Sequence, residues 1–149
     1  MKNVRDILRE KGTAVYSVSP DDTVYDALKL MAEKNVGALV VLDGDRLAGI
    51  ISERDYARKI VLKDKLSKET KVKEIMTIEM VIITPAMDLD ECMELMTENR
   101  TRHLPVVEDD RVLGIISIGD VVKGIMDHKE FLIGQLESYI KGHPVKPII

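Results

Sequence analysis

The feature that most constrains the fold of this 149-residue chain is an internal duplication with a period of 65 residues. A heptapeptide of the form Gly-Ile-Ile-Ser-x-x-Asp begins at Gly49, and the same form begins again at Gly114. Residues 19–60 align with residues 84–125 without a gap, and 14 of the 42 aligned positions are identical. Two copies are too few for a solenoid. The duplication therefore predicts two similar units that bury their open faces against each other.

Each copy has the pattern of a strand, a helix, two strands and a second helix. In the first copy the apolar run 38–42 is too short for a buried helix and precedes an Asp-Gly-Asp hairpin turn. The other segments follow from periodicity and caps: a helix at 2–11, a strand at 15–18, a helix begun by Thr23, a strand at 46–51 and a helix from Ser52. We predict a mixed α/β (α+β) fold of two tandem, pseudo-symmetric β-α-β-β-α repeats packed sheet to sheet.

The polar, lysine-rich segment 63–71 is interpreted as a linker. It divides the chain into repeat one at 1–62, repeat two at 72–128 and a C-terminal helix extension with a tail at 129–149. The last helix is expected to run to about Lys141, and its extension carries an apolar stripe formed by Leu132, Leu136, Tyr139 and Ile140. Such a stripe needs a partner, so we expect it to cover a second subunit of a homodimer or to pack back on the repeats.

The composition excludes several functional classes. The net charge of −4 and the absence of aromatic residues beside the linker lysines argue against nucleic acid as a partner. One cysteine and three unclustered histidines predict no disulfide and no metal site. We find no nucleophile–base pair and no P-loop, which predicts a protein that is not an enzyme and has no catalytic residues. Without a signal-like or membrane-spanning apolar segment, a cytoplasmic location with no membrane contact is expected.

The repeated Ser-x-x-Asp has a purely structural interpretation. Ser52 with Asp55, and Ser117 with Asp120, have the spacing of a capping box at the start of a helix. Losing such a cap costs about 0.5–2 kcal/mol. The same geometry suits a ligand, because a helix N-terminus presents free N–H groups to phosphate and a carboxylate accepts hydrogen bonds from a ribose diol. The two interpretations are compatible. The preceding Ile51 and Ile116 are candidates for holding a flat base.

The duplicated unit, with Gly-h-h-Ser-x-x-Asp (h, apolar) closing the third strand of each copy, resembles the cystathionine-β-synthase (CBS) domain pair, or Bateman module. The resemblance covers about residues 3–126 and includes the segments 72–77 and 102–107. It is similar to the stand-alone, two-repeat type with no attached enzyme or channel. The resemblance implies an adenosine nucleotide (AMP, ADP, ATP or NAD) in the clefts between the repeats. Asp55 and Asp120 would then hold ribose hydroxyls, with Ser52 and Ser117 near the phosphate or ribose.

The two copies differ at a position that matters for phosphate. Arg102 and His103, preceded by Thr101, align with Gly37 and Ala38. A basic pair is not required by the repeat, so it is either a solvated rim or a phosphate contact, for which Arg offers bidentate geometry.

The clefts should therefore differ, and Arg54 is the one basic residue inside the first Ser-x-x-Asp. We expect the cleft centred on Ser117 and Asp120 to be the principal phosphate site.

Two functions remain open at this point. The first is a non-enzymatic sensor that binds an adenosine nucleotide, uses no catalytic cofactor and transmits occupancy to a regulated protein partner. The alternative is a ligand-free scaffold for protein interaction or dimerisation, with the extended last helix as its contact surface.

Overall fold

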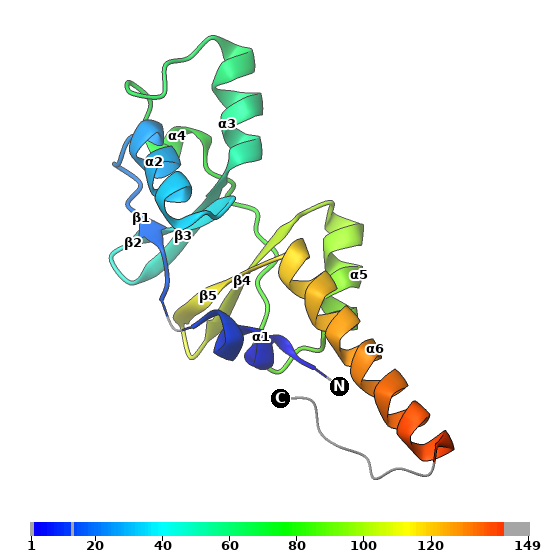
Figure 1. The fold of residues 1–149 in the computed structure, drawn as a ribbon. Helices are drawn as coiled ribbons and strands as arrows, with labels where there is room; N and C mark the ends of the chain where they lie inside the picture. The colour runs from blue at the N-terminus through cyan, green and yellow to red at the C-terminus, as the bar shows by residue number, and fades with distance from the viewer. Residues whose placement is uncertain (1, 13, 142–149) are drawn as a thin grey trace.

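The computed structural model describes residues 2–12 and 14–141. Its elements follow the predicted order (Figure 1). In the first half they are α1 (Val4–Lys11), β1 (Ser17–Val18), α2 (Val24–Lys34), β2 (Ala38–Asp43), β3 (Arg46–Ser52), α3 (Glu53–Lys59) and the 3-10 turn η1 (Val61–Lys63). In the second half they are α4 (Val72–Ile75), α5 (Leu89–Asn99), β4 (His103–Glu108), β5 (Arg111–Ser117) and α6 (Ile118–Ile140).

The two sheets confirm the duplication down to their register. In β2–β3, Val40 lies opposite Ile50, and in β4–β5 the equivalent Pro105 lies opposite Ile115. Both antiparallel pairs shift register at the same point, after Val41 and after Val106. Repeat one adds β1, which runs parallel to β2 at the edge of a three-stranded sheet.

Repeat two departs from the predicted unit because its first strand is reduced to one parallel bridge, Ile83 to Val106, beside a two-stranded sheet.

The helix that precedes each repeat packs with the other repeat. Val4 and Ile7 of α1 are buried in one core cluster with Ile116 and Val121 of repeat two. In the same way, Val72 and Ile75 of α4 join the core cluster of repeat one, which contains Leu39 and Ile51. Figure 1 shows α1 beside β4 and β5, and α4 beside α2. The units of packing therefore cross the boundaries of the sequence repeat, and this exchange ties the two halves together.

The end of the linker is more ordered than a solvated spacer. The backbone N–H groups of Val24 and Tyr25, at the start of α2, donate to the carbonyls of Thr70 and Ser67. Thr70 is buried, and its hydroxyl donates to the carbonyl of Leu66. The linker therefore satisfies the first free N–H groups of α2, which have no partner inside the helix.

The last helix runs to Ile140, as expected, and its distal part extends away from both sheets (Figure 1). The predicted stripe does not pack back on the described part of the chain, because its side chains are about half to four-fifths exposed: Leu132, Leu136, Tyr139 and Ile140. Within residues 2–12 and 14–141, no helix is both long and apolar enough to cross a membrane.

A candidate ligand pocket between the repeats

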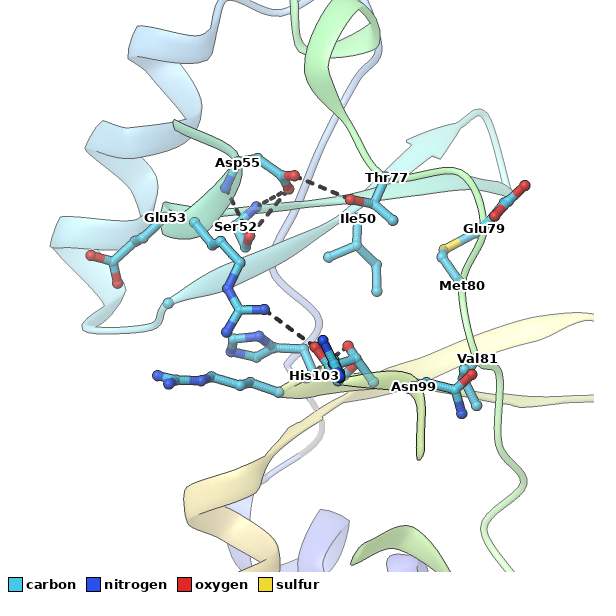
Figure 2. A pocket seen from close by; sticks show the side chains of 15 residues that line it. Ile50, Ser52, Glu53, Asp55, Thr77, Glu79, Met80, Val81, Asn99 and His103 are labelled. Carbon is cyan, nitrogen blue, oxygen red and sulfur yellow. Dashed lines mark hydrogen bonds between the residues drawn. The ribbon is translucent and has the colours of Figure 1, made fainter. Parts of the chain in front are cut away.

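The largest described cavity lies where the two repeats meet and has a volume of about 610 Å³. Three segments line it (Figure 2). Repeat one contributes Gly37, Ile50, Ser52, Glu53, Arg54 and Asp55; the chain after α4 contributes Thr77, Glu79, Met80 and Val81; repeat two contributes Asn99, Arg100, Thr101, Arg102 and His103. This volume is typical of a small-molecule site. The lining combines aliphatic side chains with carboxylates and several cationic groups.

The carboxylate of Asp55 is the most constrained polar group in the pocket. Its Oδ2 accepts from the Ser52 backbone N–H (3.0 Å) and the Ser52 hydroxyl (3.1 Å), and Ser52 Oγ accepts the Asp55 N–H (3.2 Å). This is the predicted capping box at the start of α3. Its Oδ1 accepts the Thr77 hydroxyl (3.1 Å) and lies 2.9 Å from Lys59 Nζ. Asp55 thereby links α3 to the segment after α4 (Figure 2).

The close approach of that segment depends on Gly49. Thr77 and Ile50 exchange two backbone hydrogen bonds, of 2.8 and 3.0 Å, which carry the segment along β3. A Cβ on Gly49 would lie 2.9 Å from the Thr77 carbonyl oxygen and 2.9 Å from Met76 Sδ, closer than a side chain tolerates. The glycine of the repeated motif is therefore explained by packing, and it places the Thr77 hydroxyl beside Asp55.

The opposite wall of the pocket is basic. Arg100, Arg102 and His103 come from the end of α5 and the start of β4, and Arg54 reaches across from α3 to donate to the Arg100 carbonyl (3.2 Å). Burial is the main cause that lowers the pKa of His103, and the positive charges of Lys11, Arg102 and Arg54 act in the same direction. His103 is therefore held neutral and ready to gain a proton beside an anion.

The second Ser-x-x-Asp forms its own capping box at the start of α6. Asp120 Oδ2 accepts the Ser117 backbone N–H (2.8 Å), and Ser117 Oγ accepts the Asp120 N–H (3.1 Å). Lys11 of α1 also donates to Asp120 Oδ2 (2.8 Å) and to the Ile115 carbonyl (3.0 Å). Burial tends to raise the pKa of Asp120, but the bonds from Lys11 and Ser117 outweigh it and the pKa is lowered.

The structure combines the predicted residues differently from our expectation. Arg102 and His103 line the cavity of Ser52 and Asp55, whereas we had grouped them with Ser117 and Asp120. The reason is that the two repeats face each other, so each motif meets the strand start of the opposite repeat.

Gly37 lines the same large cavity, close to His103 Nε2, while Ala38 lines a smaller one of about 60 Å³ beside Lys11 and Gly114. Thr101 and Arg54 lie in the large cavity, as the basic pair does.

The two isoleucines chosen to hold a base are both fully buried in the cores. Ile51 and Ile116 have no exposed surface, and Ile50 lines the cavity in the first repeat. Successive side chains of a strand point to opposite faces, so one residue of the Ile-Ile pair faces the core and the other faces the cleft. The motif indicated the pair correctly but did not indicate the face.

Several lining residues were missed by the sequence argument. Glu53, Thr77, Glu79, Met80, Val81, Asn99 and Arg100 line the cavity, and Lys11 contacts Asp120. Thr77 had a usable signal, since it closes the segment 72–77 that supported the resemblance. Lys11 had none, because only the exchange of α1 onto repeat two places it there.

Other chemistry is limited in the described ranges. No group of three or more His, Cys, Asp or Glu side chains among residues 2–12 and 14–141 is placed to hold a metal ion. Cys92 is buried in the core of repeat two, and burial raises the pKa of its thiol to about 11, which disfavours the reactive thiolate.

Comparisons with known proteins agree with this architecture. The family model described as CBS domain matches the chain twice, at residues 4–62 and 72–127. The mitochondrial CBS domain-containing protein CBSX3 of Arabidopsis thaliana is 45% identical over 93% of this chain and 72% of its own length. A solved structure, a putative signal-transduction protein with CBS domains from Burkholderia ambifaria, has a TM-score of 0.81 and 52% identity over 85% of this chain and 95% of its own.

A hexameric CBS-CP12 protein from bloom-forming cyanobacteria is a further structural neighbour, with a TM-score of 0.73 and 30% identity over 81% of this chain and 66% of its own.

The chain belongs to the CBS domain family and consists of two tandem CBS repeats followed by a long helix. Proteins built on such pairs are generally regulatory modules and often bind adenosine ligands.

Proposed function

We propose that this chain is a non-enzymatic regulatory module that binds an adenosine nucleotide in the 610 Å³ cavity and passes its occupancy to a partner protein. The observation that carries the proposal is the meeting, in one cavity, of the Ser52–Asp55 capping box with the basic wall of Arg102 and His103. The two groups come from different repeats. A ligand that contacts both would bias the relation of the repeats, as a regulatory ligand must.

The charges of the cavity favour a phosphorylated ligand. All four acceptor contacts of Asp55 are made inside the protein, by Ser52, Thr77 and Lys59. A ribose diol would have to replace one of them. The guanidinium group of Arg102, in contrast, makes no side-chain hydrogen bond within the described ranges and suits a phosphate in bidentate geometry. We therefore expect AMP, ADP, ATP or NAD to bind more tightly than adenosine.

Titration calorimetry and thermal unfolding with these five compounds test the proposal. A ligand at 100 times its Kd stabilises a fold by about 2.7 kcal/mol, which is a rise of about 5–10 °C for a chain of this size. Arg102→Ala should weaken nucleotide binding by about tenfold or more, because a charged hydrogen bond contributes about 1.5–3 kcal/mol. Arg111→Ala removes the same charge from an exposed strand start and should leave the Kd unchanged.

Absence of any shift with all five compounds at millimolar concentration would refute the proposal. Equal weakening by Arg102→Ala and Arg111→Ala would refute the assigned phosphate contact and leave only a general charge effect.

Ser117 and Asp120 are proposed as a second, weaker nucleotide position, with Lys11 as its basic residue. Lys11 Nζ now donates to Asp120, so a ligand that uses this carboxylate has to displace that contact. In the alternative function, a scaffold for protein interaction, the long exposed face of α6 is the relevant feature. The two functions are compatible, because the face lies on a different part of the molecule from the cavity.

A further inference from the structure

Helix α6 carries a continuous apolar stripe that its own repeat does not cover. Its members recur every three or four residues and are 39% to 74% exposed: Ile118, Val122, Met126, Ile133, Leu136 and Ile140. Val121 and Gly124, which face the core of repeat two, lie on another side of the helix at 3.6 residues per turn. The stripe is thus distinct from the buried face. It continues along the distal part of α6, which extends away from both sheets (Figure 1).

Two charged residues flank the middle of this stripe. Lys129 lies one turn before Ile133, and Glu137 lies one turn after it. Neither forms an ion pair with another residue of the described ranges. Two parallel, in-register copies of α6 would place Lys129 against Lys129 and Glu137 against Glu137, which is repulsive. Two antiparallel copies centred on Ile133 place each Lys129 beside Glu137 of the other copy.

A cavity at the side of the stripe points to the same arrangement. It has a volume of about 210 Å³ and is lined by Leu89, Ile125, Leu132 and neighbouring side chains. Tyr139 shares the side of α6 that carries Ile125 and Leu132, because the three residues are spaced seven apart. In an antiparallel pair centred on Ile133, Tyr139 of one copy lies within a turn of Ile125 of the other. The side chain of Tyr139, which is 80% exposed in a single copy, then has an apolar cavity to enter.

From these observations we infer that a second copy of this chain pairs with the α6 stripe in an antiparallel crossing centred near Ile133. The charge pattern of the stripe is complementary to itself only in that direction, and the same pairing brings Tyr139 to the cavity of the other copy. The interface does not include the nucleotide cavity, so it stands or falls separately from the proposed ligand.

Sedimentation equilibrium of the full chain at low salt tests the charge complementarity. The variants Lys129→Glu and Glu137→Lys each turn two attractive contacts into repulsive ones and should raise the dimer Kd about tenfold. The double variant Lys129→Glu/Glu137→Lys restores both pairs and should return the Kd to near its original value. Arg46→Glu makes the same charge change as Lys129→Glu on an exposed hairpin and should have no effect.

Cysteine cross-linking tests the direction of the helices. In an antiparallel pair centred on Ile133, two copies of residue 126 lie about 21 Å apart, far beyond disulfide reach. Met126→Cys and Ile140→Cys should therefore form no disulfide when each is oxidised alone, and a mixture of the two variants should cross-link. Cys92 is buried and is shared by all variants.

A monomeric chain, single charge variants with an unchanged Kd, or self-cross-linking of Met126→Cys would each overturn the inference. Rescue by the double variant together with cross-linking only in the mixture would support it. Circular dichroism of each variant confirms that it is folded before association is measured.

Discussion

The aspartates of the two motifs occupy equivalent positions, yet the structure predicts that they contribute unequally to stability. Asp55 is nearly buried, with a side chain 8% exposed, whereas the side chain of Asp120 is 24% exposed. Asp55 accepts three hydrogen bonds, from Ser52 twice and from Thr77 once, and pairs with Lys59. Asp120 accepts one backbone bond from its own cap and pairs with a partly exposed lysine. Replacing each with alanine compares the two environments at one motif position.

The expected losses follow from these contacts. Three hydrogen bonds at about 0.5–1.5 kcal/mol each give a loss of about 2–4 kcal/mol of unfolding free energy for Asp55→Ala. For Asp120→Ala, one such bond and a solvent-screened ion pair of about 0.2–1 kcal/mol give about 1–2 kcal/mol. At about 2–4 °C per kcal/mol for a chain of this size, Asp55→Ala should melt several degrees below Asp120→Ala.

Urea unfolding followed by circular dichroism, without nucleotide, measures both losses on the same scale. Asp55→Asn serves as a control that keeps the shape of the side chain and should retain part of the stability. The reasoning is refuted if Asp120→Ala is as destabilising as Asp55→Ala, since the link from Asp55 to Thr77 and Lys59 would then contribute nothing measurable.

Two further predictions concern the cavity wall and the motif glycine. The lowered pKa of His103 means that the unfolded chain binds its proton more readily, so this contribution to stability is present above about pH 6.5 and is lost as the pH falls through the folded pKa. A bound phosphate reverses the preference, so the ratio of nucleotide Kd in His103→Gln to that in the original chain should rise from pH 7.5 to 5.5; a flat ratio would contradict a role for His103. Gly49→Ala should lose about 1–3 kcal/mol in urea unfolding because its Cβ meets the Thr77 carbonyl. Gly37→Ala should lose much less, because its Cβ meets the movable end of Glu53, and equal losses would contradict the packing argument.

Much of the fold was predictable because the chain repeats its own local signals. Ser52 and Ser117 begin helices in both copies, as the capping-box spacing predicted, and the Asp-Gly-Asp turn closes the expected hairpin. The end of α6 was also correct. The missing first strand of repeat two was not predictable, because the parallel bridge at Ile83 depends on how far the segment follows β4 rather than on its own residues.

The candidate site was predicted as a set of residue types but not as an arrangement. Ser52, Asp55, Arg102 and His103 were all singled out, and all four line one cavity. Their grouping was not evident, because a motif marks a turn within one repeat and carries no information on which surface of the other repeat it meets.

The sequence by itself determined that the chain is a duplicated α+β protein, where its helices begin, and which side chains can serve a phosphorylated ligand. These properties are local, since caps, turns and strand alternation act over a few residues. Only the tertiary structure decided that α1 and α4 exchange cores, that Lys11 meets Asp120, and that Arg102 faces the motif of the opposite repeat. Those contacts join residues distant in the chain, and they arise because each repeat buries its apolar surface against elements of the other.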